Sequence, residues 1–352
     1  MNRKDLLNRY EGSILKFATE RFEIEGEDIH AFDAYEGCAN LVYACKQMDR
    51  PVILRVSYSQ DRSYQQILAE LDFIQYLAQN GVRVAEPIPS IHGKLIEELQ
   101  TGETSCYFVC FTKGPGSRVP DNNYRYRQDA PIEEYFQNWG AMLGKMHALS
   151  KQYHFPGLNP RRPDWFQLHA RKLDIDSNIP NSLPLVKRRV SGLLDQLTAL
   201  PKDFQGYGLI HGDFNDGNFT VDYTNGNITV FDFDDCCYFW FAYELAAAWE
   251  GGIGRVMFEN VDKRKNFMDR YMGHVLTGYT KWNILPDEWL EKIPLFIRVI
   301  QVEEFLHYVQ YIQEDNKEIQ SHLKYLITCI EQDLPYMGFF DRIYSHNHPF
   351  SL

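Results

Sequence analysis

Aspartates and asparagines crowd two short stretches in the second half of the chain, and these stretches limit the available folds most strongly. Residues 211–218 read HGDFNDGN, and residues 232–235 read DFDD. Apolar runs with strand character, residues 208–210 and 228–231, precede them. Because unpaired charge beside a buried strand is costly, these carboxylates need partners, and a divalent cation with oxygen ligands is the usual one.

The spacing within these stretches is typical of a kinase catalytic loop. Asp213 is followed five residues later by Asn218, and Asp232 comes after the next strand. A hairpin turn at residues 225–226 folds the two strands back, so that Asp232 can face Asn218. We therefore predict phosphoryl transfer, in which Asp213 orients or deprotonates an acceptor hydroxyl and Asn218 and Asp232 hold Mg²⁺. His211 is predicted to support the loop through a hydrogen bond.

Phosphoryl transfer also needs positive charge on the remaining phosphates, and the first third of the chain offers it. Residues 52–55 read VILR, which matches the kinase strand motif V-A-I-K with Arg55 in place of lysine. Glu70 follows in a predicted helix, where it borders the buried face and can reach Arg55. Gly37 and Asn40 precede this strand, where a turn that covers phosphates belongs. Neither a Walker A motif nor G-x-G-x-x-G is present, so P-loop and Rossmann folds lack their fingerprints.

The pattern of elements divides the chain into two lobes. A length of 352 residues suggests about two units. We predict a helical extension in residues 1–30 and strands near residues 40–45 and 51–56. A helix follows, with Ile67, Leu71 and Ile74 on one face, and two more strands are predicted at residues 88–95 and 105–112. A loop rich in Gly, Pro and Asn spans 113–130, and helices dominate the rest. We predict an N-terminal nucleotide-binding lobe over 1–112 and a helical catalytic and acceptor-binding lobe over 113–352.

Composition narrows the class of partner and the location. The chain has 36 basic and 48 acidic residues, a net charge of −12, which disfavours nucleic acid and anionic membranes and allows a cationic substrate. Seven cysteines without a CxxC pair argue against zinc ribbons and disulfide frameworks. The N-terminus lacks a signal-peptide core, and the most apolar stretch, residues 238–249, is short and contains Glu244. We expect a cytoplasmic protein.

Together these motifs resemble the aminoglycoside phosphotransferase and choline kinase family, and within it bacterial homoserine-kinase and RdoA-like Ser/Thr kinase members. The resemblance runs from Tyr35 to Trp249. It implies an α+β fold of two lobes like that of protein kinases, with a small antiparallel sheet in the first lobe and a mostly helical second lobe. It also implies ATP between the lobes, with adenine held by a connector at Phe111, Thr112 and Lys113. Arg55 departs from the lysine of many relatives, and Asp216 stands where proline is common.

Acceptor recognition is expected in the second lobe. Helical spacing places Glu303 and His307 on one face, and we predict an acceptor site there. Asp234 and Asp235 are further candidates for substrate contact. The acceptor predicted is a small molecule with a hydroxyl group, such as an amino alcohol, an aminoglycoside, a sugar or a hydroxy amino acid.

Three alternatives stay open at the level of sequence. One is a Ser/Thr protein kinase of the RdoA-like type. Another is a metal-dependent hydrolase that uses His211, Asp213, Asp232 and Asp234. The third is a pseudokinase that binds nucleotide without turnover.

Overall fold

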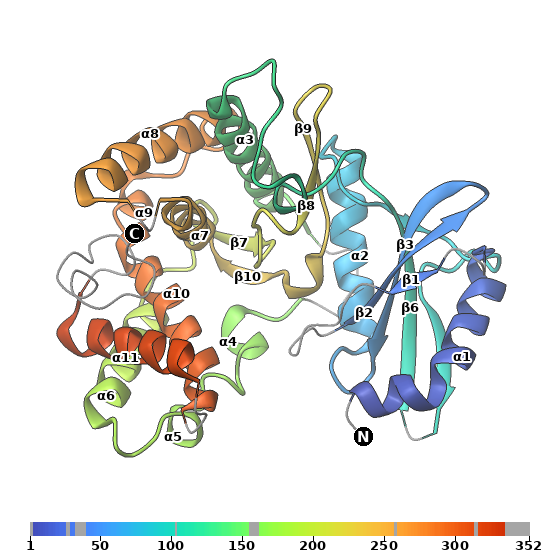
Figure 1. Ribbon diagram of the computed structural model, residues 1–352, viewed down its shortest axis with the longest axis horizontal. Coiled ribbons are helices and arrows are strands. Elements are labelled where there is room, and N and C mark those ends of the chain that lie inside the picture. Colours follow the sequence, from blue (N-terminus) through green and yellow to red (C-terminus); the bar gives the residue numbers. More distant parts are fainter. Residues whose placement is uncertain are drawn as a thin grey trace.

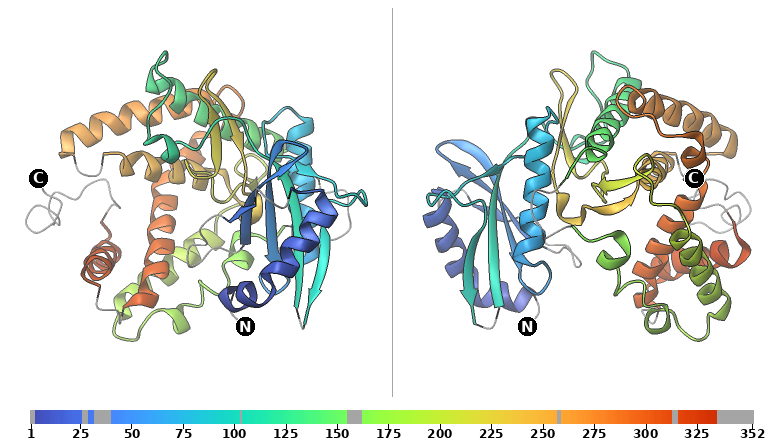
Figure 2. Two further views of the ribbon diagram at one scale, coloured as in Figure 1. Left: turned by 45° about the vertical axis from the view of Figure 1, so that its right-hand side comes forward. Right: turned by 180° about the vertical axis from the view of Figure 1, so that it is seen from behind.

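The computed structural model describes residues 3–25, 29–31, 40–102, 104–154, 162–256, 259–312 and 316–334. The chain forms two lobes, an N-terminal lobe built on a sheet and a larger, mostly helical C-terminal lobe (Figure 1). The view from behind in Figure 2 shows that α2 lies between the sheet and the helical lobe. The predicted α+β fold class, with a small antiparallel sheet in the first lobe and a mostly helical second lobe, is confirmed.

Six strands of the described residues form the antiparallel sheet of the N-terminal lobe. Its order is β1-β2-β3-β6-β4, and β5 also pairs with β6. The strands are β1 (His30–Ala31), β2 (Asn40–Gln47), β3 (Arg50–Tyr58), β4 (Pro87–Ile88), β5 (Glu97–Thr101) and β6 (Thr104–Thr112).

Helices cover both faces of this sheet, and strand alternation decides which residues face which helix. In α1 (Arg3–Phe22), Ile14 and Phe22 share a core with Leu54 and Phe108. On the other face, α2 (Tyr64–Gln79) shares a core with Val109, the next residue along β6. Arg55, the next residue along β3, therefore points towards α2 and the second lobe.

The strand predicted over residues 88–95 is wrong. Only Pro87–Ile88 pairs with β6, and a turn follows. The Ser90 hydroxyl accepts hydrogen bonds from the backbone N–H groups of His92 and Lys94, and Gly93 adopts φ +73°. This turn chemistry delays the strand until β5 begins at Glu97.

The C-terminal lobe packs helices around two small β-ribbons. Its helices are α3 (Ile132–Ser150), α4 (Trp165–Leu168), α5 (Ile175–Asn178), α6 (Pro184–Thr198), α7 (Phe241–Gly254), α8 (Val261–Tyr279), α9 (Asp287–Leu290), α10 (Ile293–Tyr308) and α11 (Lys317–Gln332). The ribbons pair β7 (Tyr207–Ile210) with β10 (Cys237–Trp240) and β8 (Phe219–Asp222) with β9 (Asn227–Val230). Short 3₁₀ turns lie at Pro120–Asn122, Phe233–Asp235 and Val309–Tyr311.

The helix α3 lies directly against α8. A side chain at Gly140 or Gly144 would collide with backbone of α8, because an added Cβ would stand 1.9 Å from the Val275 carbonyl oxygen or 2.3 Å from that of Tyr279. Glycine at these positions therefore permits the close approach of the two helices.

The two lobes are joined by backbone and side-chain contacts beside the ribbons. The Ala85 N–H donates to the Val230 carbonyl at 2.8 Å, and the Val230 N–H donates to the Arg83 carbonyl at 2.9 Å. Phe73 of α2 lies edge-on to Phe233, with ring centroids 6.1 Å apart. The second lobe is thereby held against α2 just where the residues 232–235 follow β9.

Within the described ranges, none of the helices combines the length and apolarity needed to cross a bilayer. Six cysteines of these ranges are free and buried. Cys38 and Gly37, the predicted phosphate-turn glycine, lie outside the described residues, as does the part of the C-terminal tail after residue 334.

Candidate active site

The loop of residues 211–218 connects β7 to β8 and presents Asp213 to solvent. Both carboxylate oxygens accept hydrogen bonds from side-chain amides. Asn215 donates to Oδ1 at 2.8 Å, and Asn218 donates to Oδ2 at 2.7 Å. The surrounding protein raises the pKa of Asp213, and the negative charge of Asp234 adds to this effect. The result is an accessible carboxylate whose orientation is fixed on both sides.

A buried glutamate holds the backbone of this loop. Glu244 in α7 accepts hydrogen bonds from the N–H groups of His211 and Gly212, at 3.3 and 3.0 Å, and from the His147 ring at 2.7 Å. Burial disfavours the charge of the Glu244 carboxylate, but the hydrogen bonds that it accepts from His147 and Gly212 outweigh burial and lower the pKa of Glu244. Burial lowers the pKa of His147, although the neighbouring Glu244 opposes this effect. Gly212 has φ +89°, and a Cβ there would meet the Asp235 carbonyl oxygen at 2.3 Å.

His211 links the two polar loops. Its Nε2 lies 3.0 Å from the Phe231 carbonyl oxygen, and its Nδ1 lies 3.3 Å from the Asp213 backbone nitrogen. The carbonyl needs a donor and the N–H needs an acceptor, so the Nε2–H tautomer satisfies both contacts. The ring therefore ties Asp213 to the residue immediately before Asp232.

Asp232 lies beside Asn218 because the two loops are hydrogen-bonded together. The Phe231 N–H donates to the Asn218 carbonyl at 3.0 Å, and Asp232 follows in the left-handed conformation at φ 66°. Its side chain is solvent-exposed, yet its pKa lies well above the usual value, since surrounding protein and the charge of Asp234 oppose ionisation. An acidic side chain in a strained backbone conformation at a loop junction is typical of functional sites.

The donors in this corner fit a divalent cation. Asp213, Asp232 and Asp234 repel one another electrostatically, and Asn218 adds an amide oxygen. Carboxylate and amide oxygens are hard ligands, and a cation would relieve the repulsion. In the described ranges, no three His, Cys, Asp or Glu side chains form a metal-binding group by themselves. A kinase-type site does not need such a group, because nucleotide phosphates and water complete the coordination of Mg²⁺.

Arg55 and Glu70 form a buried bidentate pair behind this corner. The Arg55 Nη1 and Nη2 atoms lie 2.7 and 2.8 Å from the two Glu70 carboxylate oxygens. Burial opposes the charge of Arg55, but Glu70 outweighs it, and the pKa of Arg55 is raised. The Arg55 Nε is buried without a hydrogen-bond partner among the described residues. A spare cationic donor here fits a phosphate oxygen, so the pair suits the nucleotide that the sequence predicts.

The predicted connector ends β6. Phe111 is buried and lies under Arg55, whose guanidinium carbon is 5.2 Å from the ring centroid. The N–H of Thr112 donates to the Glu86 carbonyl at 2.9 Å, and that of Lys113 donates to the Pro51 carbonyl at 3.4 Å. These contacts hold the three residues against the N-terminal lobe, with Phe111 beside the Arg55–Glu70 pair.

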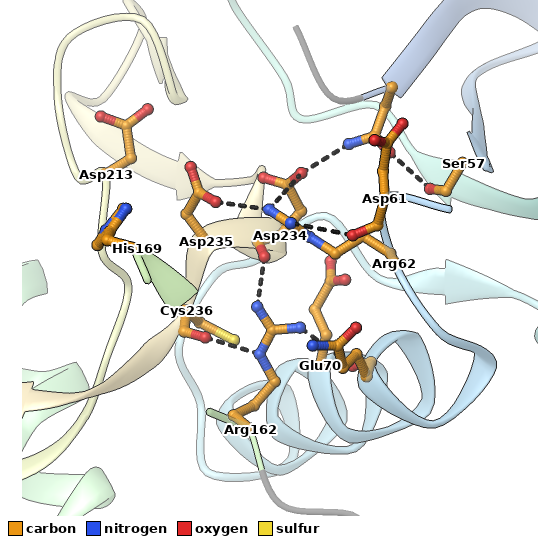
Figure 3. A network of polar contacts seen from close by, with 12 residues as sticks. Ser57, Asp61, Arg62, Glu70, Arg162, His169, Asp213, Asp234, Asp235 and Cys236 are labelled. Atoms are coloured by element: carbon orange, nitrogen blue, oxygen red, sulfur yellow. Dashed lines mark hydrogen bonds and ion pairs between the residues drawn. The ribbon is translucent and has the colours of Figure 1, made fainter. Parts of the chain in front are cut away.

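A network of polar contacts crosses between the lobes at the loop of residues 232–236 (Figure 3). Asn40 donates from Nδ2 to Asp234 at 2.7 Å, and Arg62 contacts Asp235 at 2.7 Å. Arg162 donates to the backbone carbonyls of Asp234 and Cys236. Asp234 is therefore engaged by the N-terminal lobe.

The candidate acceptor residues lie in different surroundings. Asp235 remains 43% exposed, and the surrounding protein together with Asp234 raises its pKa to about 6. Glu303 accepts hydrogen bonds from the Trp165 indole at 3.0 Å and from the Tyr243 hydroxyl at 2.8 Å. His307 is exposed and lies against Tyr308 and Tyr311. The structure therefore does not join Glu303 and His307 in shared contacts, although both belong to α10.

Sequence reasoning missed Glu244, Arg62 and Arg162. Glu244 had a usable signal, since it is the one charged residue in the most apolar stretch of the chain. A lone charge in a buried helix needs partners, which points to a structural or functional network. The two arginines had no such signal, because their contacts are set by tertiary structure and follow no local pattern.

A two-lobed α+β fold with an Asp213-Asn218-Asp232 corner and a buried cation-carboxylate pair defines a phosphotransferase of the protein-kinase-like class. The model of the phosphotransferase enzyme family matches residues 34–282, and the chain belongs to this family.

Several known proteins are similar to the chain. Amicoumacin kinase of Bacillus subtilis is 28% identical over 336 residues, which cover 94% of this chain and 95% of that protein. Homoserine kinase of Neisseria meningitidis serogroup B is 30% identical over 181 residues, covering 51% of this chain and 52% of that protein. A solved structure of amicoumacin kinase with AMP-PNP, Ca²⁺ and Ami superposes with a TM-score of 0.84 at 28% identity, and the match covers 95% of this chain and 97% of that one.

These similarities confirm the predicted family and the predicted class of enzyme, a kinase that phosphorylates a hydroxyl group of a small molecule. They also support a divalent metal ion alongside the nucleotide.

Proposed function

We propose that the γ-phosphoryl group of ATP is the group transferred, that the metal is Mg²⁺, and that Asp213, Asn218 and Asp232 are the residues at the centre of the reaction. The observation that carries this proposal is the fixed orientation of Asp213, both of whose oxygens accept amide hydrogen bonds while its side chain stays open to solvent. A group that must orient an incoming hydroxyl needs both properties.

Each residue has a role that its contacts support. Asp213 accepts a hydrogen bond from the acceptor hydroxyl and takes its proton as the phosphoryl group is transferred. Asn218 and Asp232 hold Mg²⁺, which when bound supplies charge neutralisation to the phosphates. Arg55, held by Glu70, directs its spare Nε towards a phosphate oxygen. His211 keeps the loops of Asp213 and Asp232 in contact.

Among the predicted acceptor contacts, Asp235 suits the role best. Its carboxylate contacts Arg62 through Oδ1, yet it is half-exposed and close enough to Asp213 for their charges to interact. Asp234 is buried and engaged by Asn40, and Glu303 already accepts two hydrogen bonds. An acidic group at this position favours an acceptor with a positive charge near its hydroxyl.

The proposal extends to the division of the chain into lobes and to its location in the cell. We propose that the lobes divide after Thr112, with residues 1–112 binding nucleotide and residues 113–352 binding the acceptor. A cytoplasmic location agrees with the free, buried cysteines of the described ranges and with the need for ATP.

The test is an ADP-release assay with Mg²⁺, ATP and a panel of hydroxylated acceptors. The panel includes amicoumacin, homoserine, choline, an aminoglycoside, a neutral sugar and a Ser/Thr peptide. We expect one class of small molecule to stimulate ADP release, EDTA to abolish it, and mass spectrometry to find the acceptor heavier by one phosphoryl group. Release of inorganic phosphate that no acceptor changes, or phosphorylation of the peptide alone, would contradict the proposal.

A further inference from the structure

Arg162 is a buried arginine whose hydrogen bonds end on both lobes. It precedes α4, and only 4% of its surface is exposed. Its Nη1 donates to the Gln66 carbonyl of α2 at 3.1 Å. Its Nε donates to the Cys236 carbonyl at 2.6 Å, and its Nη2 donates to the Asp234 carbonyl. In Figure 3 its guanidinium lies between the 232–236 loop and α2.

The three carbonyls lie next to the two parts of the site that come from different lobes. Gln66 is one helical turn before Glu70, the residue that orients Arg55. Asp234 and Cys236 follow Asp232 by two and four residues. A single side chain thus joins the helix that holds the phosphate-facing cation to the loop that carries a predicted metal ligand.

The chemistry of the side chain suits this task. A guanidinium is planar and offers five N–H donors in a fixed geometry, so it can bind three carbonyls in set directions. Burying such a charge is costly when no carboxylate contacts it. Burial opposes the charge of Arg162, but Cys236, Glu70 and Asp234 nearby outweigh burial and raise the pKa of Arg162, so they offset part of that cost.

Arg62 provides a contrast within the same network. It contacts the Asp235 carboxylate, which is 43% exposed, so that ion pair is screened by water and salt. Arg162 instead binds backbone, and backbone contacts fix where the 232–236 loop lies rather than how one side chain points.

We propose that Arg162 is a positioning residue for phosphoryl transfer, which holds α2 and the 232–236 loop at a fixed spacing and thereby aligns Arg55 with Asp232. The assignment of Arg55 and Asp232 rests on the proposed function, whereas the coupling of the two segments does not.

Hydrogen–deuterium exchange of the full chain without nucleotide tests the coupling directly. The variants are Arg162→Met, Arg162→Lys and, as a control for the loss of a buried arginine, Arg264→Met in α8, whose side chain is 5% exposed. For Arg162→Met we expect exchange to accelerate about tenfold or more in both the 232–236 loop and the first turn of α2, the change that follows from losing a hydrogen bond to a charged donor. Strands β2 and β3 should exchange as in the wild type.

A binding measurement tests the consequence for the site. We expect the Mg²⁺ concentration that half-saturates AMP-PNP binding to rise several-fold in Arg162→Met, to rise less in Arg162→Lys, and to stay unchanged in Arg264→Met. Lysine keeps the charge but cannot reach three carbonyls at once, so the conservative variant should rescue only part of the effect.

Neither the exchange measurement nor the binding measurement needs a known acceptor. Faster exchange confined to residues 162–168, the same two-segment effect in Arg264→Met, or unchanged Mg²⁺ dependence in Arg162→Met would overturn it. If Arg162→Met does not fold, the exchange of Arg162→Lys is measured instead. Wild-type exchange of this variant in both the 232–236 loop and the first turn of α2 would overturn the inference. A failed acceptor panel would refute the proposed function and leave the exchange result standing.

Discussion

Replacing Glu244 with glutamine should slow phosphoryl transfer although Glu244 touches no reacting atom. The carboxylate is 1% exposed and accepts three hydrogen bonds, from His147 and from the backbone N–H groups of His211 and Gly212. Gly212 adjoins Asp213 along the chain. The orientation of Asp213 therefore depends on a carboxylate that lies behind the loop.

The size of the effect follows from the geometry. In Glu244→Gln the amide oxygen can keep the contacts of the present Oε2, which are those with His147 and His211. The amide NH₂ then faces the Gly212 N–H, which presently donates to Oε1 at 3.0 Å, and two donors oppose each other. Loss of one hydrogen bond to a charged acceptor is worth about 1.5–3 kcal/mol, and an unsatisfied buried N–H adds a similar penalty. We expect at least about 3 kcal/mol in total, which lowers the melting temperature of a chain of 352 residues by about 4 °C or more.

The kinetic effect should exceed the effect on nucleotide binding. The two opposed donors can separate only if the Gly212 backbone moves, and this movement displaces the neighbouring Asp213. A displacement of about 1 Å at a catalytic group costs about 10²-fold in rate. We expect kcat of Glu244→Gln to fall by about that factor, with little change in the KM for ATP.

The control is Tyr279→Phe, which removes the hydroxyl that lies 2.9 Å from the His147 Nδ1 but leaves the contacts of Glu244 in place. Because the hydroxyl also accepts from the Asn283 amide at 2.6 Å, this variant should lose about 2 kcal/mol of stability, and it should keep kcat within about twofold. A folded Glu244→Gln variant with the kcat of the wild type would refute the reasoning, because the loop would then hold Asp213 without the carboxylate.

Three further predictions follow. Glu70→Gln should weaken AMP-PNP binding about tenfold or more in calorimetry, because Arg55 loses half of a buried bidentate pair, and unchanged affinity would contradict its role. Gly212→Ala should lower both the melting temperature and kcat, because its Cβ meets the Asp235 carbonyl at 2.3 Å and its φ is +89°; wild-type values for both would show that the loop yields freely. Burial raises the pKa of Glu303 to about 7 from 4.5, so the protonated side chain stabilises the fold fully below pH 4.5, and this stabilisation is lost as the pH rises through 7. Glu303→Gln should therefore melt at a higher temperature than the wild type at pH 8 and lose this advantage towards pH 5. A difference in melting temperature that does not change with pH would contradict the raised pKa of Glu303.

The sequence predicted the centre of the site because its residues are spaced by local backbone geometry. Asp213 and Asn218 share one loop, and a two-strand ribbon brings Asp232 to them, so the order of residues alone implies their proximity. The Arg55–Glu70 pair was predictable for a similar reason, since a strand and the following helix pack together.

The remaining site residues could not be predicted from sequence because their contacts join distant segments. Arg162 reaches Gln66 and Cys236, residues 96 and 74 positions away. Helical periodicity placed Glu303 and His307 on one face of α10. It could not show which of the two side chains is buried, and the structure shows that Glu303 is the one that contacts Trp165. Residues 88–95 showed a competing effect, because a turn in which the Ser90 hydroxyl accepts two backbone hydrogen bonds replaced the strand that the apolar pattern predicted.

The most direct test of the account is single-turnover transfer of labelled phosphate from ATP to the acceptor found in the panel, in wild type, Asp213→Asn and the exposed control Asp269→Asn. We predict that Asp213→Asn lowers the transfer rate by about 10²–10⁴-fold while AMP-PNP binding stays at the wild-type level, and that Asp269→Asn changes neither. Transfer by Asp213→Asn at the wild-type rate would contradict the central claim, because the hydroxyl would then be activated by some other group.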